Sequence, residues 1–427
     1  MKQHLSHISK INGEIFLPGD KSISHRALIF SALAKGKSSI KNLAESDDVL
    51  TTIKCLKELK VKIQKDKDVY IIQGVGREGF KKPDVPLYCE NSGTTTRLLS
   101  GVLAAQDFHS VITGDDSLSR RPMKRVIDPL EQMGCTIKSE GEKLPLHFLP
   151  IGEIKPIEYK MPVASAQVKG AVLLAGLHCK NTTTLIENNL FTRDHTEIML
   201  NLPVDIIGNK KVIKVSGTYY PTCGNYFIPG DVSTAAFFIV LTILTRNSVL
   251  LLQNVSLNKR RTEFIYILKN MGAKISLTQK GESYNELYGD IYVESSDLKN
   301  IEISTELIPA IIDEIPILSI AGAFAEGEFS IRGAKELRVK ESDRIKSICS
   351  NLEIAGYKTI EFSDGFSFDG KIEKGHQTFE SFGDHRIAMA FSVLACLKKE
   401  GSDVSRFECV SVSNPDFLNQ LELIKAK

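Results

Sequence analysis

The sequence of 427 residues has no tryptophan, no long hydrophobic run and no Cys-x-x-Cys pair among its eight cysteines. The lack of paired cysteines argues against a zinc site and a disulfide framework, so we expect free thiols in a reducing cytosol. The longest apolar stretch, near residues 235–244, is shorter than the roughly 20 residues that cross a bilayer. The first eleven residues lack the apolar segment of a secretion signal. We therefore expect a cytoplasmic protein with no membrane partner.

An excess of charge of one sign is also missing, since 54 Lys and Arg oppose 52 Asp and Glu for a net charge of +2. A nearly neutral chain lacks the basic field that nucleic-acid partners require, so none is expected. Neither a G-x-x-x-x-G-K-[ST] loop nor a G-x-G-x-x-G turn after a strand occurs, so no nucleotide motif fits. The composition is that of a globular protein with two or three domains.

What the sequence does contain is a repeat of about 70 residues. In each copy a turn is followed by a helix of small, apolar residues. The six copies span residues 19–34, 91–105, 164–176, 230–244, 313–323 and 383–397. After most copies comes an amphipathic helix with apolar residues at i, i+3, i+4 and i+7. Gly134, Gly272 and Gly356 follow three of these helices and suit left-handed C-caps.

Each repeat reads as β-α-β-α-β-β, and one such unit cannot bury both of its helices. We therefore predict an α/β fold of two similar domains, each of three repeats packed around buried helices. The first domain covers residues 20–228. The second joins residues 1–19 to 229–427, because the strand expected at 13–17 belongs with the later repeats, and the active site lies in a cleft between them. The alternative is an ordinary α/β protein with accidental internal similarity.

Polar and cationic side chains gather where these helices begin. They include Lys21, Ser22, Arg26, Ser165, Gln167 and Arg386, with Arg121, Arg193, Lys340 and Arg344 in nearby loops, and Gly93 lies at the start of the second helix. Helix N-termini, hydroxyls and arginine forks together suit phosphate and carboxylate, which predicts a small ligand with several negative charges. A capped helix with solvated cations is the alternative.

Two carboxylates and one histidine are candidates for acid–base chemistry. Asp313 opens the fifth helix, where a carboxylate serves more often as a cap than as a base. Glu341 lies near Lys340 and Arg344, so it should stay ionised and suit the role of a base. His385 remains open among catalytic, structural and merely exposed roles.

Seven motifs, in order over nearly the whole chain, closely resemble those of the 5-enolpyruvylshikimate-3-phosphate synthase family. They lie at residues 18–27, 91–98, 121–123, 165–169, 192–196, 337–344 and 383–389. The resemblance implies the enolpyruvyl transferase fold, an inside-out α/β barrel in each domain. It implies transfer of the enolpyruvyl group of phosphoenolpyruvate to the 5-hydroxyl of shikimate 3-phosphate, with release of phosphate, in aromatic amino acid biosynthesis. It implies no metal and no organic cofactor, and we expect a monomer.

The resemblance also assigns roles to residues. Those matching shikimate 3-phosphate contacts are Lys21, Ser22, Arg26, Ser165, Ala166, Gln167, Arg193, Asp313 and Lys340. Those matching phosphoenolpyruvate contacts are Lys21, Gly93, Arg121, Gln167, Arg344 and Arg386. As catalytic residues, we expect Asp313 to take the hydroxyl proton, Glu341 to handle the C3 proton and Lys21 to stabilise charge near the leaving phosphate.

One departure concerns residues 411–416, where many relatives carry a phosphate-binding Lys and this chain has none. We read it as placing the chain closer to the divergent, glyphosate-tolerant branch, although Gly93 is retained and glyphosate sensitivity stays open. The rival with the same fold, UDP-N-acetylglucosamine enolpyruvyl transferase, needs a loop cysteine that residues 115–124 lack. The other rivals are a non-catalytic anion-binding protein and a fold-mate that processes RNA ends.

Overall fold

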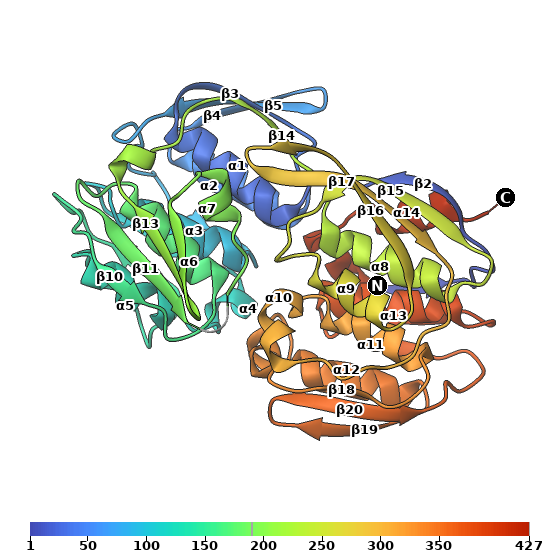
Figure 1. The fold of residues 1–427 in the computed structure, drawn as a ribbon. Helices are drawn as coiled ribbons and strands as arrows, with labels where there is room; N and C mark the ends of the chain where they lie inside the picture. The colour runs from blue at the N-terminus through green and yellow to red at the C-terminus, as the bar shows by residue number, and fades with distance from the viewer. Residues whose placement is uncertain (189–190, 427) are drawn as a thin grey trace. The chain divides into compact units, whose positions relative to one another are not determined.

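The computed structural model describes residues 1–188 and 191–426 and divides into two compact units (Figure 1). Unit 1 comprises Met1–Pro18, Pro229–Gly281 and Leu287–Lys427, and unit 2 comprises Gly19–Ile228 and Glu282–Glu286. Each unit is built from three small sheets and three buried helices. The chain passes from one unit to the other after Pro18 and after Ile228, and the short segment Glu282–Glu286 groups with unit 2.

The sheets of unit 2 share one pattern: a first strand runs parallel to a second, and the second is antiparallel to the last strand of a hairpin. In spatial order they are β14 (Asn225–Phe227), β3 (Lys35–Lys41), β5 (Val69–Val75) and β4 (Lys62–Asp66); β6 (Leu87–Tyr88), β7 (Ser110–Thr113), β9 (Leu146–Phe148) and β8 (Ile137–Lys138); and β10 (Glu158–Lys160), β11 (Thr183–Asn188), β13 (Lys210–Val215) and β12 (Val204–Ile207).

Unit 1 uses strands from both ends of the chain; its first sheet repeats this pattern, whereas each of its other two sheets has three strands in the described residues. Its sheets are β16 (Lys274–Ser283), β17 (Glu286–Glu294), β15 (Val249–Ser256) and β2 (Asn12–Phe16); β18 (Phe329–Ile331), β20 (Gly365–Gly370) and β19 (Tyr357–Phe362); and β1 (Lys2–Leu5), β22 (Ser402–Ser405) and β21 (Thr378–Glu380). The strand β2 pairs parallel with β15, and β1 completes the last sheet by pairing with β22.

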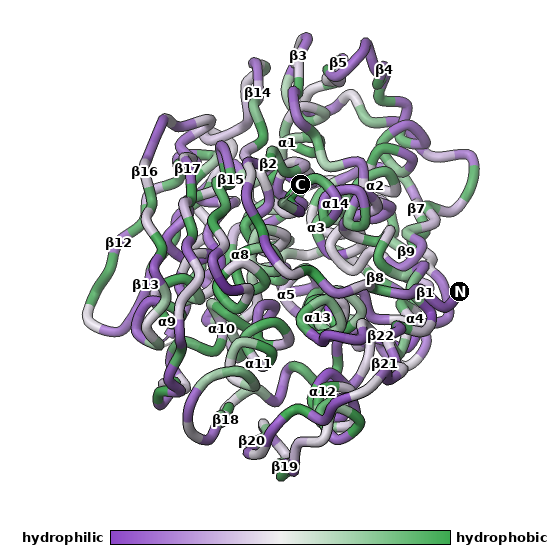
Figure 2. The backbone as a smooth tube through the Cα atoms, turned by 90° about the vertical axis from the view of Figure 1, so that its right-hand side faces the viewer, coloured by the Kyte–Doolittle hydropathy of each residue, from purple (hydrophilic) through white to green (hydrophobic). Residues whose placement is uncertain are grey.

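Six helices of small residues form the cores. They are α1 (Lys21–Leu33), α3 (Gly93–Leu103) and α6 (Ala166–Gly176) in unit 2, and α8 (Val232–Leu244), α11 (Ile315–Phe324) and α13 (His385–Leu397) in unit 1. Figure 2 shows α8, α11 and α13 largely in the colour of hydrophobic residues. Small residues let these helices approach closely: a Cβ on Gly101 of α3 would lie 2.2 Å from the carbonyl oxygen of Ala171 of α6.

The amphipathic helices cover these cores. They are α2 (Asp47–Glu58), α5 (Lys124–Gln132), α7 (His195–Met199), α9 (Glu263–Asn270), α12 (Arg344–Ile354) and α14 (Phe417–Ile424). The predicted left-handed caps are confirmed, with φ of 94° at Gly134, 110° at Gly272 and 99° at Gly356. Shorter segments are α4 (Asp116–Ser119), α10 (Ile308–Ile311), η1 (Gly217–Tyr219), η2 (Thr305–Leu307), η3 (Lys335–Val339) and η4 (Phe407–Val412).

These elements confirm the predicted α/β class with β-α-β-α-β-β repeats around buried helices. All eight cysteines are free.

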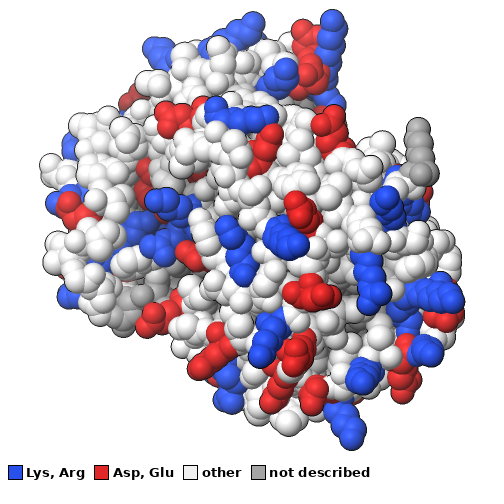
Figure 3. Space-filling model, turned by 45° about the vertical axis from the view of Figure 1, so that its right-hand side comes forward, with Lys and Arg blue, Asp and Glu red and all other residues white. Residues whose placement is uncertain are grey.

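Within the described residues, no single helix is long and apolar enough to cross a membrane. Thr305–Ile311 and Ile315–Phe324 reach the required length and hydrophobicity only when taken together, and they are bent by 116° at the break between them. Figure 3 shows Lys and Arg interspersed with Asp and Glu on the face in view, as the balanced composition predicts.

Candidate functional site

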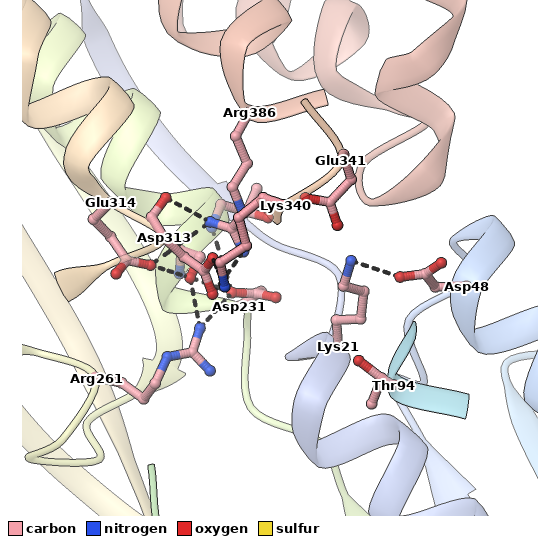
Figure 4. Close-up of polar contacts among 12 residues, drawn as sticks. Lys21, Asp48, Thr94, Asp231, Arg261, Asp313, Glu314, Lys340, Glu341 and Arg386 are labelled. Carbon is pink, nitrogen blue, oxygen red and sulfur yellow. Dashed lines mark hydrogen bonds and ion pairs between the residues drawn. The ribbon is translucent and has the colours of Figure 1, made fainter. Parts of the chain in front are cut away.

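In unit 2, the start of α1 presents the cations that the sequence singled out. Asp20 caps the helix, with its side chain accepting the N–H of Ile23 at 2.9 Å. This cap fixes the first turn, from which Lys21 reaches Asp48 of α2 with 2.8 Å between Nζ and Oδ2 (Figure 4). Lys21 therefore stands at a helix N-terminus, where backbone N–H groups already favour an anion.

Arg26 lies one turn further along α1 and is buried. Its Nη1 donates to the carbonyl oxygen of Ser22 at 2.9 Å, and its Nε donates to the Thr196 hydroxyl at 2.8 Å. Burial lowers the pKa of the Arg26 guanidinium to about 10, partly opposed by the carboxylates of Glu197 and Glu286. The side chain is thus still cationic at neutral pH and is held in a fixed position.

A second group of side chains surrounds the start of α3. Arg97 donates from Nη1 to Oε1 of Gln167 at 2.7 Å, and Nε2 of Gln167 donates to the Thr94 hydroxyl at 3.0 Å. A Cβ on Gly93 would lie 2.6 Å from Nη1 of Arg97 and 3.1 Å from Nη1 of Arg121. Glycine at this position therefore leaves room for two guanidinium groups beside the helix start.

Arg121 is oriented by a chain of polar contacts. Its Nη2 donates to Oδ1 of Asn91 at 2.6 Å, and Nδ2 of Asn91 donates to Oδ2 of Asp115 at 2.7 Å. At the neighbouring helix, Ser165 caps α6 by accepting the N–H of Val168 at 3.4 Å. Ala166 is the first residue of α6, so it offers only its backbone N–H there.

The loop that carries Arg193 is anchored by buried charges. Lys169 of α6 donates to Glu187 at 3.1 Å and to Glu197 at 2.7 Å, and all three are at least 98% buried. Glu187 in turn accepts the backbone N–H of Thr192 at 3.0 Å. Burial opposes the charge on Lys169, but Glu197 and Glu187 outweigh it and raise its pKa above the ordinary value.

In unit 1, Arg344 is the centre of the site. It begins α12, is 1% exposed, and donates to three carboxylates: Nε to Asp384 at 2.8 Å, Nη1 to Asp313 at 3.1 Å and Nη2 to Glu341 at 2.6 Å. Burial alone would lower the pKa of the guanidinium, but Asp384, Glu341 and Asp313 outweigh it and raise that pKa. Arg344 is thus a permanent buried cation.

Asp313 lies among three cations, of which Lys340 and Arg386 are labelled in Figure 4. Besides Arg344, Lys340 Nζ is 3.7 Å from Oδ1 and Arg386 Nη2 is 3.7 Å from Oδ2. Arg386 also donates from Nη1 to the carbonyl oxygen of Asp313 at 3.0 Å. The interpretation of Asp313 as a helix cap is wrong, because α11 begins at Ile315, two residues later, and the carboxylate of Asp313 instead contacts these cations.

A second layer supports Arg386. Nη1 of Arg386 lies 3.7 Å from Oε1 of the buried Glu314, and this same oxygen accepts the hydroxyl of Ser233. Arg261, which is 2% exposed, donates to Ser233 at 2.6 Å and lies 3.5 Å from Asp231, the cap of α8. The starts of α8, α11 and α13 are therefore joined by one polar network.

Most of the predicted residues are thus brought together in two sets, one in each unit. Sequence reasoning missed the partners that hold them: Asp48, Thr196, Ser233, Arg261, Glu314 and Asp384. One signal was available, since Asp231-x-Ser233 repeats Asp20-x-Ser22. His385 is buried as the first residue of α13, which makes the exposed role wrong.

The arrangement suits acid–base chemistry on an anionic substrate. Lysines and arginines can neutralise phosphate and carboxylate groups, while Asp313 and Glu341 are carboxylates held among these cations and can exchange protons with a substrate. Each charge-assisted hydrogen bond contributes about 1.5–3 kcal/mol, so several are needed to strip a polyanion of water.

Comparison with known proteins agrees with this chemistry. A model of the family described as EPSP synthase (3-phosphoshikimate 1-carboxyvinyltransferase) matches residues 5–421. A 3-phosphoshikimate 1-carboxyvinyltransferase of Petrotoga mobilis is 46% identical over all of both chains. The EPSP synthase structure from Acinetobacter baumannii has a TM-score of 0.86 at 38% identity, over 99% of this chain and 98% of that one. The enolpyruvyl transferase NikO of Streptomyces tendae shares the fold, at 14% identity and a TM-score of 0.78, over 100% of this chain and 97% of that one.

Proposed function

Since the chain belongs to the EPSP synthase family, we propose that its two sets of charged side chains divide the work of the family's reaction. The enzyme transfers the enolpyruvyl group of phosphoenolpyruvate to the 5-hydroxyl of shikimate 3-phosphate and releases phosphate, a step of the shikimate pathway. The observation that carries the proposal is the position of Asp313 among Lys340, Arg344 and Arg386. This position puts the proposed base next to the cations proposed to bind the anionic groups of the substrates.

Shikimate 3-phosphate is bound mainly by the set in unit 2. Its phosphate meets hydroxyls, cations and helix N-termini. The proposed contacts are Lys21, Ser22, Arg26, Ser165, Gln167, Arg193 and the N–H of Ala166. Asp313 and Lys340 of unit 1 hold the ring hydroxyls, which orients the 5-hydroxyl toward the Asp313 carboxylate.

Phosphoenolpyruvate is bound by residues of both units. The proposed contacts are Lys21, Gly93, Arg121, Gln167, Arg344 and Arg386. Arg344 already donates to Asp313, Glu341 and Asp384, so the substrate's carboxylate joins these carboxylates on the guanidinium or replaces one of them. If Glu341 is the group replaced, it loses its cationic partner and binds a proton more readily.

The reaction is an addition followed by an elimination. Asp313 takes the proton of the 5-hydroxyl, the oxygen attacks C2 of phosphoenolpyruvate, and Glu341 delivers a proton to C3. Glu341 then removes a proton from C3 as the C2–O bond to phosphate breaks, while Lys21 stabilises the charge on the leaving group. Positioned acid–base groups typically contribute about 10²–10⁴-fold each.

The direct test is phosphate release from phosphoenolpyruvate by the purified protein. Shikimate 3-phosphate is supplied in one reaction and UDP-N-acetylglucosamine in a parallel one. Release only with shikimate 3-phosphate is the expected result. Release only with the nucleotide sugar, or binding of shikimate 3-phosphate without turnover, would overturn the assigned acceptor or the assigned catalytic residues.

We also propose that the chain is closer to the divergent, glyphosate-tolerant branch of the family. Support comes from residues 411–416, which contain no lysine. The test is inhibition of phosphate release by glyphosate in competition with phosphoenolpyruvate. An inhibition constant well above the KM for phosphoenolpyruvate is expected, and one far below it would contradict the placement.

We propose that the enzyme works as a cytoplasmic monomer whose two units close on their substrates. The free state of all eight cysteines supports a reducing compartment, and each unit has its own three-helix core without a second copy of the chain. A ligand that contacts both units binds a closed form better and shifts the population toward it. Light scattering should give a mass near 47.3 kDa. Small-angle scattering should show a smaller radius with shikimate 3-phosphate bound.

A further inference from the structure

The register of the last sheet of unit 1 brings two histidines and a carboxylate to one face. His4 of β1 lies directly opposite Asp403 of β22. On the other side of β22, Thr378 of β21 pairs with Asp403, and His376 lies two residues before Thr378. Residues opposite one another, or two apart on a strand, point to the same side of a sheet. The opposite side belongs to the core, where Val404 is fully buried.

The side chains converge as this register requires. Nδ1 of His4 lies 2.8 Å from Oδ1 of Asp403, and Nε2 of His376 lies 3.1 Å from the same oxygen. The two imidazole rings are stacked, with centroids 5.8 Å apart and planes inclined by 16°. Among the described residues, these three are the only group of His, Cys, Asp and Glu whose ligating atoms all lie within 4.8 Å of one another.

The remaining oxygen of Asp403 is occupied by Lys2, whose Nζ lies 2.7 Å from Oδ2. Lys2 thus holds Oδ2, while Oδ1 faces the two imidazoles. The carboxylate presents one oxygen to the histidines. It would serve as a ligand through one oxygen.

We propose that His4, His376 and Asp403 form a binding site for a divalent transition metal of the zinc class. Two imidazole nitrogens and one carboxylate oxygen are a ligand set that Zn²⁺ accepts, with water completing a tetrahedron. Ligands at roughly 2.0–2.2 Å from a tetrahedral ion lie about 3.3–3.6 Å apart. The two histidine–Asp403 distances, 2.8 and 3.1 Å, would have to lengthen by less than about 1 Å to reach that spacing.

The site lies on the solvent side of the sheet, with side-chain exposures of 53% at His4, 45% at His376 and 13% at Asp403. A bound ion would connect β1 to β22 and to the segment before β21, three parts of the chain that are otherwise joined here by backbone hydrogen bonds. It would thus act as a clip on the N-terminal strand, separate from the residues proposed for enolpyruvyl transfer.

The experiment is a Zn²⁺ titration of metal-free protein by calorimetry. The protein carries no affinity tag and a Cys223→Ser substitution, because Cys223 is an exposed thiol and thiolates bind zinc. We expect one Zn²⁺ per chain, and His376→Ala should weaken binding at least about tenfold, since losing even an outer-shell partner of a metal costs that much. A melting temperature that rises with the Zn²⁺ concentration should accompany binding.

The chain provides a matched control in His109 and His147. These rings are also stacked, with centroids 5.7 Å apart and an interplanar angle of 20°, but they belong to no such ligand group. His147→Ala should therefore bind Zn²⁺ as the parent does. Absence of a one-to-one complex, or equal affinity in His376→Ala and His147→Ala, would overturn the proposal. Asp403→Asn gives a second check, because it should also weaken binding while removing no histidine.

Discussion

The guanidinium of Arg344 donates a hydrogen bond to the carboxylate of Asp313, with 3.1 Å between Nη1 and Oδ1. Arg344 is almost fully buried, whereas Asp313 is 14% exposed, so the cation is fixed and the carboxylate is open to a substrate on one side. Arg386 and Lys340 lie 3.7 Å from the two oxygens of the same carboxylate. The pair thus places the proposed base beside three cations.

Replacing Asp313 by Asn removes the base while keeping the size of the side chain and its ability to bond Arg344 and a ring hydroxyl. We expect kcat for phosphate release to fall by about 10²–10⁴-fold, the usual contribution of a positioned acid–base group. Binding of shikimate 3-phosphate should change much less. Steady-state kinetics and equilibrium binding measure the two effects separately.

Asp364→Asn is the matched control, because Asp364 also pairs with an arginine, Arg332, at 3.1 Å but on the surface. It should leave kcat unchanged. An Asp313→Asn enzyme with parental kcat would exclude Asp313 as the base.

Glu314 should act through Arg386. Its buried carboxylate lies 3.7 Å from Nη1 of Arg386 and accepts the hydroxyl of Ser233. Glu314→Gln removes the charge that orients Arg386 through this ion pair, so we expect the KM for phosphoenolpyruvate to rise about tenfold, which corresponds to about 1.4 kcal/mol. The loss in kcat should be smaller than that of Asp313→Asn.

The matched control for Glu314→Gln is Glu361→Gln, which removes an exposed carboxylate that lies 2.9 Å from Arg338. Its KM should match the parent. A Glu314→Gln variant whose KM for phosphoenolpyruvate is unchanged would show that Arg386 is positioned without Glu314.

Much of the fold could be predicted from sequence because its signals are local. The helix period and the glycine after each amphipathic helix are read from neighbouring residues, and Gly134, Gly272 and Gly356 are all left-handed. Pairing across the chain is less local. The repeat places the strand at 13–17 with the later repeats, and β2 does pair with β15. The hydrogen bonds of β1 with β22, between residues about 400 positions apart, had no such guide and were not predicted.

The residues of the site also divide into those marked by local sequence and those fixed by long-range packing. Lys21 and Gly93 stand at helix starts, which the turn residues mark, so their positions could be predicted. The contact between Ser233 and Glu314 joins two helices 81 residues apart and depends on packing. The role of Asp313 was ambiguous for a related reason: a carboxylate near a helix start predicts a cap, and only the distant Arg344, Lys340 and Arg386 explain why it is not one.

Gly93→Ala should impair phosphoenolpyruvate binding without unfolding the protein. The added Cβ would lie 2.6 Å from Nη1 of Arg97 and 3.1 Å from Nη1 of Arg121. Both atoms are the ends of flexible side chains, which can move, so we expect a change in unfolding free energy below about 1 kcal/mol. The KM for phosphoenolpyruvate should rise because the guanidinium groups are displaced.

Gly152→Ala is the control, since a Cβ there meets nothing within 4 Å. Urea unfolding and steady-state kinetics on both variants are sufficient. Parental KM in Gly93→Ala would mean that Arg97 and Arg121 do not need the space that glycine leaves.

The stability of the protein should depend on pH through His178. Burial, followed by the positive charge of Arg77, lowers the pKa of His178 to about 4. The unfolded chain, with a histidine pKa near 6.5, binds more protons between pH 4 and 6.5, so the free energy of unfolding falls as the pH is lowered through that range. The contribution is at most about 3 kcal/mol.

His178→Asn should remove this part of the pH dependence, whereas His147→Asn should keep it. Urea midpoints at several values between pH 4.5 and 7.5 provide the comparison. Equal slopes for His178→Asn and the parent would show that His178 is not the group responsible. Glu197 does not interfere, because its pKa is about 2: burial raises it, but Lys169 and Lys211 outweigh burial. Its stabilising contribution is therefore lost only below about pH 4.5.

Lys169→Met tests whether the buried charges of unit 2 hold the loop that carries Arg193. Lys169 lies within 3.1 Å of Glu187 and Glu197, and removing it leaves two buried carboxylates without this cation. We expect a loss of about 3–5 kcal/mol in the free energy of unfolding. Lys180→Met, which breaks an exposed pair with Glu153 at 3.0 Å, should cost about 0–1 kcal/mol.

The effect of Lys169→Met should also reach the substrate. Glu187 holds the backbone N–H of Thr192, one residue before Arg193, and Glu197 lies one residue after Thr196, which accepts a hydrogen bond from Arg26. Loosening either carboxylate moves a proposed phosphate contact, so the Kd for shikimate 3-phosphate should rise in the folded variant. The Kd is measured at a temperature where circular dichroism shows Lys169→Met to be fully folded. A destabilised variant with parental affinity would separate the two roles, because it would show that the ionic cluster supports the fold of unit 2 without positioning Arg193 or Arg26.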